Sequence, residues 1–330
     1  MADVATGTGR QAVEPALEEH RRELTGYCYR MLGSASDAED AVQETMVRAW
    51  RKADRFEGRS SVRTWLYSIA TNVCLDLING KQRRALPMDL GPSSPADVSL
   101  LGPQTSEEMW VLPAPDGRVL STDDDPAERA VASESIRLAF VAALQHLPAR
   151  QRAVLVLREV LRWKADEVAE LLDSTVASVN SALQRARATL DSADITPTER
   201  WEPSDPAQQE FLARYVDAFE RYDMDSLLAL LDEDVKQDMP PYELWLEGRE
   251  SIREWYLGPG AACQGSRLVP TRANGSPAFG QYRPSGPGGA HEPWALQVLE
   301  LAEGRIVEMH FFLDTATLFP LFGLPAHPDG

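Results

Sequence analysis

Residues 37–45 read Asp-Ala-Glu-Asp-Ala-Val-Gln-Glu-Thr, and this stretch decides the fold of the first part of the chain. Ser36 with Glu39 three positions later is a capping box, which marks the start of a helix. Small and apolar residues then recur at helical spacing, so one side of this helix is expected to face a core. These residues are Ala38, Val42, Thr45, Met46 and Ala49.

The other side of this helix carries carboxylates and an amide at i, i+3 and i+4 spacing, which places them along one face. A basic helix of a large partner could pair with that face. For this helix taken alone, a solvated acidic surface is the ordinary explanation. The candidate binding residues are Asp37, Glu39, Asp40, Gln43 and Glu44.

A second helix is expected after the break at residues 58–61, within a segment, 15–86, that reads as helical throughout. It carries an apolar stripe so wide that most of its members, Trp65 included, are expected in the core. Asn72 and Asp76 lie one turn apart and could brace each other. The stripe consists of Val62, Trp65, Leu66, Ile69, Ala70, Val73, Leu77 and Ile78.

Residues 133–192 are predicted to be helical again. A short amphipathic helix at 164–172 and a longer helix at 176–190 are separated by a turn with capping residues at 173–175. Two such helices after a supporting helix favour a helix-turn-helix. Val179, Leu183 and Ala186 are expected to be its core.

Residues 87–132 are rich in proline and acidic residues, which is typical of a linker. They nevertheless contain an apolar run, Trp110, Val111, Leu112 and Pro113, and disordered linkers seldom carry one. We expect this run to dock on a folded domain. An incidental apolar cluster in a flexible tether is the alternative.

Residues 205–325 mix helices and strands. Phe211, Tyr215 and Phe219 fall on one helical face, and strands at 295–301 and 306–313 joined by Glu303-Gly304 read as a hairpin. Helices followed by antiparallel strands favour an α+β cone.

Composition limits the classes of function. The 330-residue chain has a net charge of −18, which by itself argues against nucleic-acid binding, yet its basic residues gather at 48–63 and 185–187. Such a chain could bind DNA only weakly by itself, and could need a partner protein that presents it to the DNA. Three separated cysteines argue against a zinc site or a disulfide framework. The start lacks a signal-peptide pattern and no apolar run could span a membrane, so a cytoplasmic protein without membrane, metal or cofactor is expected.

Taken together, the motifs at 37–45 and 61–72 resemble region two of extracytoplasmic-function (ECF) RNA polymerase sigma factors, and those at 147–155, 165–172 and 179–187 resemble region four. They cover roughly half of the chain. Residues 205–325 resemble the SnoaL-like, NTF2-like fold, most clearly at 273–282 and 311–325. The resemblance implies two all-α modules followed by an α+β cone, with domains at 15–86, 133–192 and 205–325 and a linker at 87–132.

The resemblance also implies partners and sites. The acidic face would bind core RNA polymerase, in particular the coiled coil of its β′ subunit, with the β subunit as a second contact. Promoter DNA would be bound at two elements. The −10 contacts would be Arg55, Phe56, Arg59, Arg63, Tyr67, Asn72, Arg83 and Arg84. The −35 contacts would be Ser174, Thr175, Ala177, Ser178, Asn180, Ser181, Gln184, Arg185 and Arg187, with Asn180 suited to adenine and Arg185 to guanine or phosphate.

The SnoaL-like fold implies a pocket that could hold a small-molecule ligand, with Asp238, Trp245, His291 and His310 as candidate lining residues. No His/Asp pair is recognisable by spacing, so no catalytic residue and no enzymatic activity are expected. The C-terminal domain and the linker are instead expected to modulate a sigma factor. Whether a separate anti-sigma protein exists stays open.

Two alternatives remain. One is an ordinary helix-turn-helix transcription regulator with a ligand-sensing domain. The other is a SnoaL-like isomerase or cyclase tethered to a DNA-binding module, which would need a pocket carboxylate or imidazole with a shifted pKa.

Overall fold

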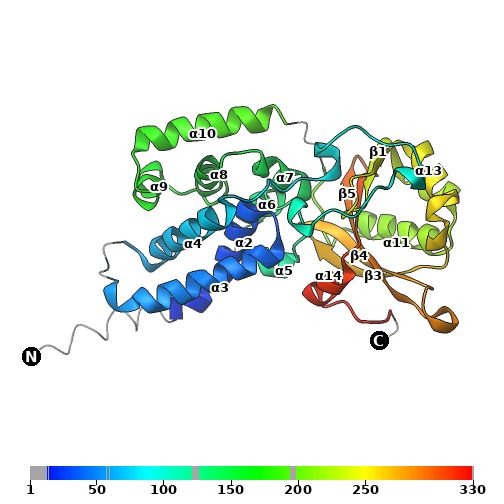
Figure 1. Ribbon diagram of the computed structural model, residues 1–330, viewed down its shortest axis with the longest axis horizontal. Coiled ribbons are helices and arrows are strands. Elements are labelled where there is room, and N and C mark those ends of the chain that lie inside the picture. The colour runs from blue at the N-terminus through cyan, green and yellow to red at the C-terminus, as the bar shows by residue number, and fades with distance from the viewer. Residues whose placement is uncertain are drawn as a thin grey trace, which may run out of the picture. The chain divides into compact units, whose positions relative to one another are not determined.

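The computed structural model describes residue 13 and residues 15–56, 58, 60–120, 126–193 and 198–328. The chain divides into two compact units (Figure 1). The helical unit comprises residues 1–84 and 111–195, and the sheet unit comprises residues 85–110 and 196–330, as far as these are described. None of the described helices is long and apolar enough to cross a membrane.

The first half of the helical unit is a three-helix bundle of α2 (Arg21–Leu32), α3 (Ala35–Lys52) and α4 (Val62–Ile78). A 3-10 turn, η1 (Ala53–Arg55), follows α3. The helix predicted from residue 37 is confirmed, but its capping box is wrong: α3 begins two residues earlier, and the Ser34 hydroxyl accepts the N–H of Asp37. Ser36 instead hydrogen-bonds to Ser34.

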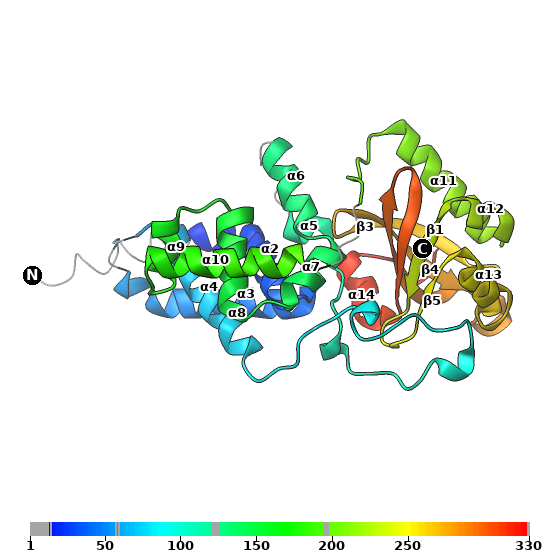
Figure 2. The same ribbon diagram turned by 90° about the horizontal axis from the view of Figure 1, so that it is seen from above.

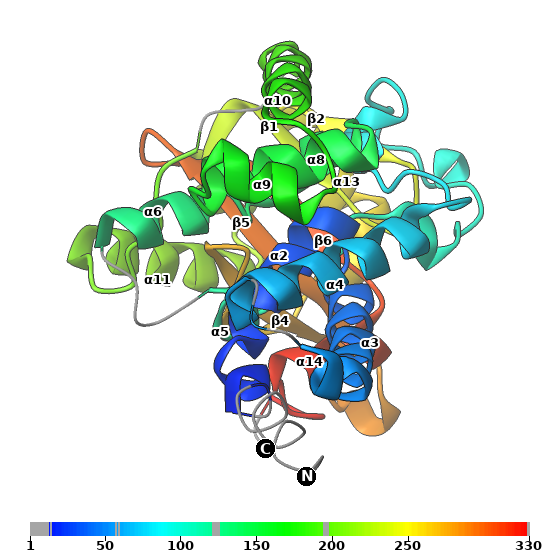
Figure 3. The same ribbon diagram turned by 90° about the vertical axis from the view of Figure 1, so that its left-hand side faces the viewer.

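The second half contains α5 (Asp116–Val119), α6 (Pro126–Glu134), α7 (Leu138–Gln145), α8 (Ala149–Leu155), a π-helical turn η5 (Val156–Val160), α9 (Ala165–Leu171) and α10 (Val176–Asp191). The predicted helix-turn-helix is α9–α10. Thr175 caps α10 by accepting the N–H of Ser178. Figure 3 looks nearly along α10, which packs on α8 and α9 through Val179, Leu183 and Ala186.

The sheet unit begins with three 3-10 turns in the linker, η2 (Pro87–Asp89), η3 (Val98–Leu100) and η4 (Glu107–Met109). Its later helices are α11 (Pro206–Glu220), α12 (Met224–Ala229), α13 (Arg249–Leu257) and α14 (Thr315–Phe322), with short turns η6 (Pro259–Cys263) and η7 (Pro287–Gly289). The strands are β1 (Leu231–Asp238), β2 (Trp245–Glu247), β3 (Arg267–Ala273), β4 (Ser276–Arg283), β5 (Glu292–Ala302) and β6 (Arg305–Phe312).

The strand order is β2-β1-β6-β5-β4-β3, and β1 runs parallel to β6 while the other neighbours are antiparallel. One face packs with Tyr215 and Phe219 of α11 into the apolar core. Helix α14 packs on β5, and Phe319 contacts Tyr282 on the other face (Figure 2). The predicted hairpin is β5–β6, and its turn uses positive φ at both Glu303 and Gly304.

The boundaries of the two units differ from the expected domains. The sequence predicts regions 15–86 and 133–192 as separate modules, whereas the structure places both in the helical unit. The expected linker is also divided: residues 85–110 belong to the sheet unit and residues 111–120 to the helical unit. Hydrogen bonds of the buried Arg30 and Arg152, which pattern analysis does not pair, join the two predicted modules within the helical unit.

Candidate polymerase and nucleic-acid interface

Three of the five acidic-face candidates on α3 already have partners inside the helical unit. Arg84 donates to Asp37 at 2.8 Å, and Arg48 donates to Glu44 at 2.7 Å. Arg118 of α5 donates to Glu39. Asp40 and Gln43 are exposed on the outer side of the helix. Asp40 and Gln43 can therefore contact a partner protein without first breaking one of these ion pairs.

Two exposed apolar side chains extend the same row of α3 and were missed by the sequence analysis. Val47 is 36% exposed and Trp50 is 51% exposed. Asp40, Gln43, Val47 and Trp50 are spaced by three, four and three residues, the repeat that places side chains on one helical seam. This spacing was readable in the sequence, but exposure of the apolar pair was not.

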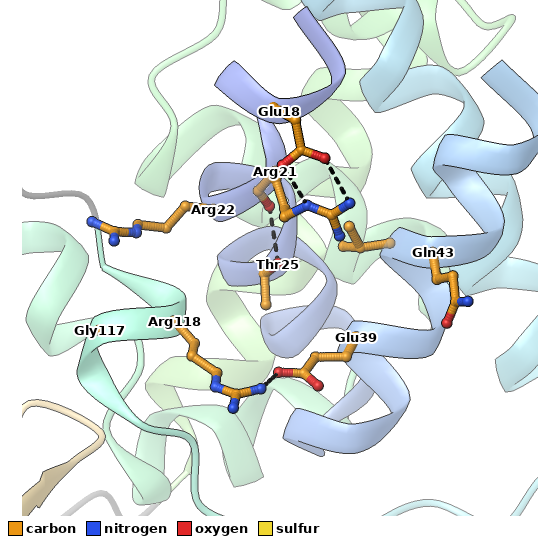
Figure 4. A pocket seen from close by; sticks show the side chains of 9 residues that line it. Glu18, Arg21, Arg22, Thr25, Glu39, Gln43, Gly117 and Arg118 are labelled. Atoms are coloured by element: carbon orange, nitrogen blue, oxygen red, sulfur yellow. Dashed lines mark hydrogen bonds and ion pairs between the residues drawn. The ribbon is translucent and has the colours of Figure 1, made fainter. Parts of the chain in front are cut away.

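A hollow of about 670 Å³ lies beside this row (Figure 4). Glu18, Arg21 and Arg22 come from the N-terminal side, Glu39 and Gln43 from α3, and Arg118 from α5. Helix α5 packs closely on α2, because a Cβ added at Gly26 would lie 2.5 Å from the carbonyl oxygen of Val119. The end of the linker thus reaches the edge of the acidic face.

Two of the predicted −10 residues, Arg63 and Tyr67, pack against Trp163 in the helical unit. Arg63 donates to both carboxylate oxygens of Glu23, and its guanidinium lies 5.3 Å from the ring centre of Tyr67 and 5.2 Å from that of Trp163. Tyr67 is fully buried and its ring lies 5.0 Å from Trp163, two residues before the start of α9. Trp163 therefore covers Tyr67 and contacts the partly exposed Arg63, and only the tertiary structure revealed its position.

The other −10 candidates are scattered. Phe56 packs against Trp65, which is only half-buried rather than a core residue as expected. Asn72 is exposed but donates to the Ser68 carbonyl, while Asp76 pairs with Arg48, so the expected Asn72–Asp76 brace is wrong.

The remaining arginines divide into three groups. Arg83 is exposed and contacts His146 at 3.1 Å. Arg84 is 8% exposed and held by Asp37, which leaves little of it to reach a DNA backbone. The side chain of Arg55 and the whole of Arg59 lie outside the described part of the chain.

The predicted −35 residues lie on the exposed surface of α10 and its preceding turn. All nine are exposed: Ser174, Thr175, Ala177, Ser178, Asn180, Ser181, Gln184, Arg185 and Arg187. Two are partly committed, because the Thr175 hydroxyl caps the helix and Arg187 donates to Glu159 at 2.6 Å. The helix therefore offers a surface that duplex DNA could reach.

Two buried arginines join the region-four helices to α2. Arg152 of α8 donates to the carbonyls of Met31, Gln145 and Leu147. Arg30 of α2 donates to the Ser135 hydroxyl at 2.8 Å and to the Ala132 carbonyl at 3.0 Å. Burial lowers the pKa of each guanidinium to about 10. Such groups are tolerated in a core only because carbonyl and hydroxyl oxygens accept their N–H groups.

The apolar linker run is buried in the structure. Trp110, Val111 and Leu112 are 1%, 0% and 7% exposed, and Pro113 is buried. In the helical unit, Leu112 donates its N–H to the Gly33 carbonyl, and the Tyr29 hydroxyl donates to the Leu112 carbonyl. This run therefore adds backbone hydrogen bonds to the end of α2.

The linker part of the sheet unit forms a strap, residues 85–110, that is hydrogen-bonded to the β1–β2 connection and β2. Ser94 donates its N–H to the Trp245 carbonyl, the Trp245 indole donates to the Gly91 carbonyl, and Thr105 donates to the Pro241 carbonyl. Leu101 packs against the apolar core. Trp245, a candidate pocket residue, is thus engaged by the strap.

The strand register brings three of the four pocket candidates together. Asp238 on β1 is opposite Trp245 on β2 and opposite His310 on β6, whereas His291 precedes β5 and contacts the Gly265 carbonyl. The His310 Nδ1 donates to Asp238 Oδ2 at 2.8 Å, and Nε2 lies 3.4 Å from Glu308. The side chains of Asp238 and His310 have no exposed surface. No local pattern could indicate this pair, because 72 residues separate its members.

The surroundings shift both pKa values. Burial raises the pKa of Asp238, and His310 opposes this only in part. Burial alone would lower the pKa of His310, but Asp238 and Glu308 raise it well above its usual value. Protonated His310 therefore stabilises the folded chain. That contribution is complete below pH about 6.5 and is lost as the pH rises through the higher pKa of the folded state.

We expect a nuclear magnetic resonance titration of the full chain to give His310 a pKa well above its usual value. Asp238→Asn should lower the pKa of His310, because burial then opposes the charge with less compensation. Substitution of the exposed His327, by His327→Gln, serves as the assignment control. A His310 pKa at or below its usual value in the unaltered chain would contradict this prediction.

Other chemical features are modest. Cys28 and Cys74 are buried and Cys263 is half-buried, and all three are free thiols. Among the described residues, no cluster of three or more His, Cys, Asp or Glu side chains is arranged to hold a metal ion.

An exposed helix-turn-helix, a helical bundle with an acidic-apolar row, and an added mixed sheet define a DNA-binding transcription protein with a C-terminal α+β domain. Family models agree with each part. Sigma-70 region 2 matches residues 16–84, Sigma-70 region 4 matches residues 137–190, and the SnoaL-like domain matches residues 212–309.

Relatives extend this likeness over nearly the whole chain. The ECF RNA polymerase sigma factor SigG of Mycobacterium tuberculosis is 46% identical over 314 residues, which cover 93% of this chain and 82% of the relative. The probable ECF sigma factor SigI of the same organism is 25% identical over 317 residues, covering 94% and 96%. The chain therefore belongs to the ECF RNA polymerase sigma factors.

A solved structure shows the same fold. The crystal structure of the M. tuberculosis ECF sigma factor SigJ matches with a TM-score of 0.60 at 22% identity, covering 95% of this chain and 99% of that one. Sigma factors are not enzymes; they bind core RNA polymerase and promoter DNA.

Proposed function

We propose that this sigma factor binds core polymerase through the row Asp40, Gln43, Val47 and Trp50 on α3. The observation that carries this assignment is the exposure of an apolar pair next to acidic and amide side chains on one helix. A partner helix with apolar residues on its seam and basic residues beside them fits such a row. The family resemblance implies that this partner is the coiled coil of the β′ subunit, in the cytoplasm where polymerase acts.

We infer that the described helical unit is a closed form. Trp163 covers Tyr67, so α4 cannot present this side chain to single-stranded −10 DNA while the region-four helices stay packed on it. The partly exposed Arg63 is held between Glu23 and Trp163. A binding partner shifts an equilibrium between two conformations by the difference in its affinity for them. Only the open form can contact both promoter elements, so we expect polymerase at a promoter to favour the open form.

A pair of fluorophores can test this opening. Cysteines introduced at Lys52 of α3 and Ala188 of α10, in a chain whose native cysteines are serines, would carry donor and acceptor dyes. Energy transfer is expected to fall when core polymerase is added. Dyes at Lys52 and Asp76, both in the first bundle, form the control pair and should not change. Unchanged transfer at the first pair would refute the closed form.

We further propose that the C-terminal domain modulates the sigma factor by holding the strap. The strap hydrogen bonds to Trp245 and Pro241 and the packing of Leu101 support this role. While the strap stays hydrogen-bonded to the sheet unit, the linker cannot adopt the other conformations that binding of polymerase would require. The hydrogen-bonded strap, rather than a ligand pocket, is therefore the proposed means of control.

Leu101→Asp, which places a charge against the apolar core, and deletion of residues 205–330 are both expected to change promoter-specific transcription several-fold in a reconstituted assay. Leu257→Asp is the matched control, because Leu257 is 58% exposed on α13. Activity unchanged by both alterations would remove the regulatory role.

A polymerase-independent regulator is the second candidate, favoured by the freely exposed α10. It requires tight duplex binding by the chain alone. A mobility-shift assay with and without core polymerase separates the two, and binding that is independent of polymerase would favour the regulator.

A further inference from the structure

The strap exposes a cluster of apolar side chains to solvent (cyan in Figure 2). Leu90, Val98 and Leu100 are 42%, 58% and 50% exposed. They are three of the seven large apolar side chains that are exposed in the described part of the chain. Single exposed apolar side chains are ordinary on protein surfaces, whereas a cluster of them marks an interaction site more often.

The cluster borders a groove of about 460 Å³ in the sheet unit. Four leucines line this groove. Leu90 and Leu100 are exposed, whereas Leu244 belongs to the apolar core and Leu101 packs against that core. The groove therefore has a buried base and exposed apolar edges, and its volume is within the range of binding sites, about 300–1000 Å³.

Hydrogen bonds on both sides of the exposed leucines hold the groove in shape. Ser94 donates its N–H to the Trp245 carbonyl at 2.8 Å, and Thr105 donates its N–H to the Pro241 carbonyl at 3.0 Å. The η3 turn between these two contacts is capped by the Asp97 carboxylate. A groove that is already formed loses little conformational entropy when a partner binds.

Negative charge surrounds the groove. The strap contains four acidic residues and no Lys, Arg or His, and residues 237–248 also contain no basic residue. Glu243 lines the groove and is exposed. Asp97 and Glu247 are exposed as well, and the Glu247 carboxylate accepts the Ser93 hydroxyl at 3.2 Å. An occupant of the groove therefore meets carboxylates at its rim.

This charge selects among the classes of occupant. The carboxylates would repel the phosphates of nucleic acids and the headgroups of anionic lipids. A second copy of the chain, with its net charge of −18, would be repelled as well. A segment with apolar side chains for the groove and Lys or Arg for the rim is complementary in both respects.

We propose that this groove is a docking site for a segment of another protein that combines large apolar side chains with Lys or Arg. The apolar side chains fill the groove against Leu90 and Leu100, and the basic side chains pair with Glu243 and Asp97. Because the strap forms part of the groove, the bound segment also holds the strap on the sheet unit. The groove contains no residue of the α3 row or of α10, so the inference does not depend on the proposed polymerase surface.

Selection of peptides on the full chain tests the proposal. Short random peptides displayed on phage are first depleted on the immobilised Leu100→Asp variant and then bound to the unaltered chain. Leu100 is half exposed, so the variant is expected to keep its fold, and circular dichroism checks this. The recovered peptides are expected to be rich in Lys, Arg and large apolar residues. Recovery of no peptide, or of peptides rich in Asp and Glu, would overturn the proposal.

Synthetic copies of the recovered peptides then locate the site by fluorescence anisotropy. Leu100→Asp, Leu90→Ser and Glu243→Lys are each expected to weaken binding at least about tenfold. Leu257→Asp is the matched control, because Leu257 is 58% exposed on α13 of the same unit, and it should bind as the unaltered chain does. Unchanged binding by Leu90→Ser and Glu243→Lys would overturn the proposal.

Two further measurements separate this site from other occupants. Hydrogen exchange at the amides of Ser94 and Thr105 should slow when the peptide is bound, because opening of the strap then requires its release. Exchange in α10 should not change, and slowing there instead of in the strap would overturn the proposal. Light scattering of the chain without peptide should give the mass of one copy. A dimer that Leu100→Asp dissociates would assign the groove to a second copy and overturn the proposal.

Discussion

Combining Asp40→Lys, Val47→Asp and Trp50→Ala in one chain is expected to lower its affinity for core polymerase at least about a hundredfold. Truncation of a central aromatic anchor in an interface costs about 2 kcal/mol or more, and a reversed charge adds repulsion against a basic partner. Binding of a fluorescently labelled chain to purified core polymerase measures this effect directly.

The fold should tolerate these changes, because Asp40 and Trp50 are exposed and Val47 is at the edge of exposure. Substitutions at such positions usually shift stability by no more than about 0.5 kcal/mol. The matched control applies the same chemistry to α13 through Glu254→Lys and Leu257→Asp. Equal loss of binding in the control, or full binding by the α3 variant, would refute the proposed polymerase surface.

Arg152→Met is expected to lower the free energy of unfolding of the helical unit by about 3 kcal/mol or more. The substitution keeps most of the side-chain volume but removes donors from the carbonyls of Met31, Gln145 and Leu147. A buried acceptor left without a donor costs about 1–3 kcal/mol. Denaturant unfolding followed by far-ultraviolet circular dichroism measures the change.

Arg221→Met is the control for this experiment. Arg221 makes a surface ion pair with Asp217, four residues earlier on α11, with both side chains about two-thirds exposed. Exposed pairs of this kind contribute about 0–1 kcal/mol. A loss no larger for Arg152→Met than for Arg221→Met would show that the Arg152 hydrogen bonds do not hold the region-four helices to α2.

Much of the local structure was predictable. The helical spacing after residue 37, the stripe at 62–78 and the turn at 173–175 correspond to α3, α4 and the connection between α9 and α10. These patterns depend on residues within about two helical turns of one another, and such short-range periodicity survives in any fold that buries one face. The β5–β6 hairpin was equally local.

The candidate site was only partly predictable. Residue type indicated α3 and α10 as candidate binding surfaces, but not that Arg84 is committed to Asp37 or that Tyr67 is buried. The capping box at Ser36 failed because the helix already begins at Ala35, where the Ser34 hydroxyl accepts the N–H of Asp37. Alternatives this close in the sequence differ little in local energy, so packing decides between them.

The amino-acid sequence by itself determined which segments are helices, where the recognition helix lies and to which family the chain belongs, because these properties follow from local periodicity and from motif order. Only the tertiary structure decided that Trp163 covers Tyr67, that the strap is bound to Trp245 and that Asp238 meets His310. Each of these contacts joins residues far apart in the chain, and their pairing depends on strand register and helix packing, which no local pattern encodes.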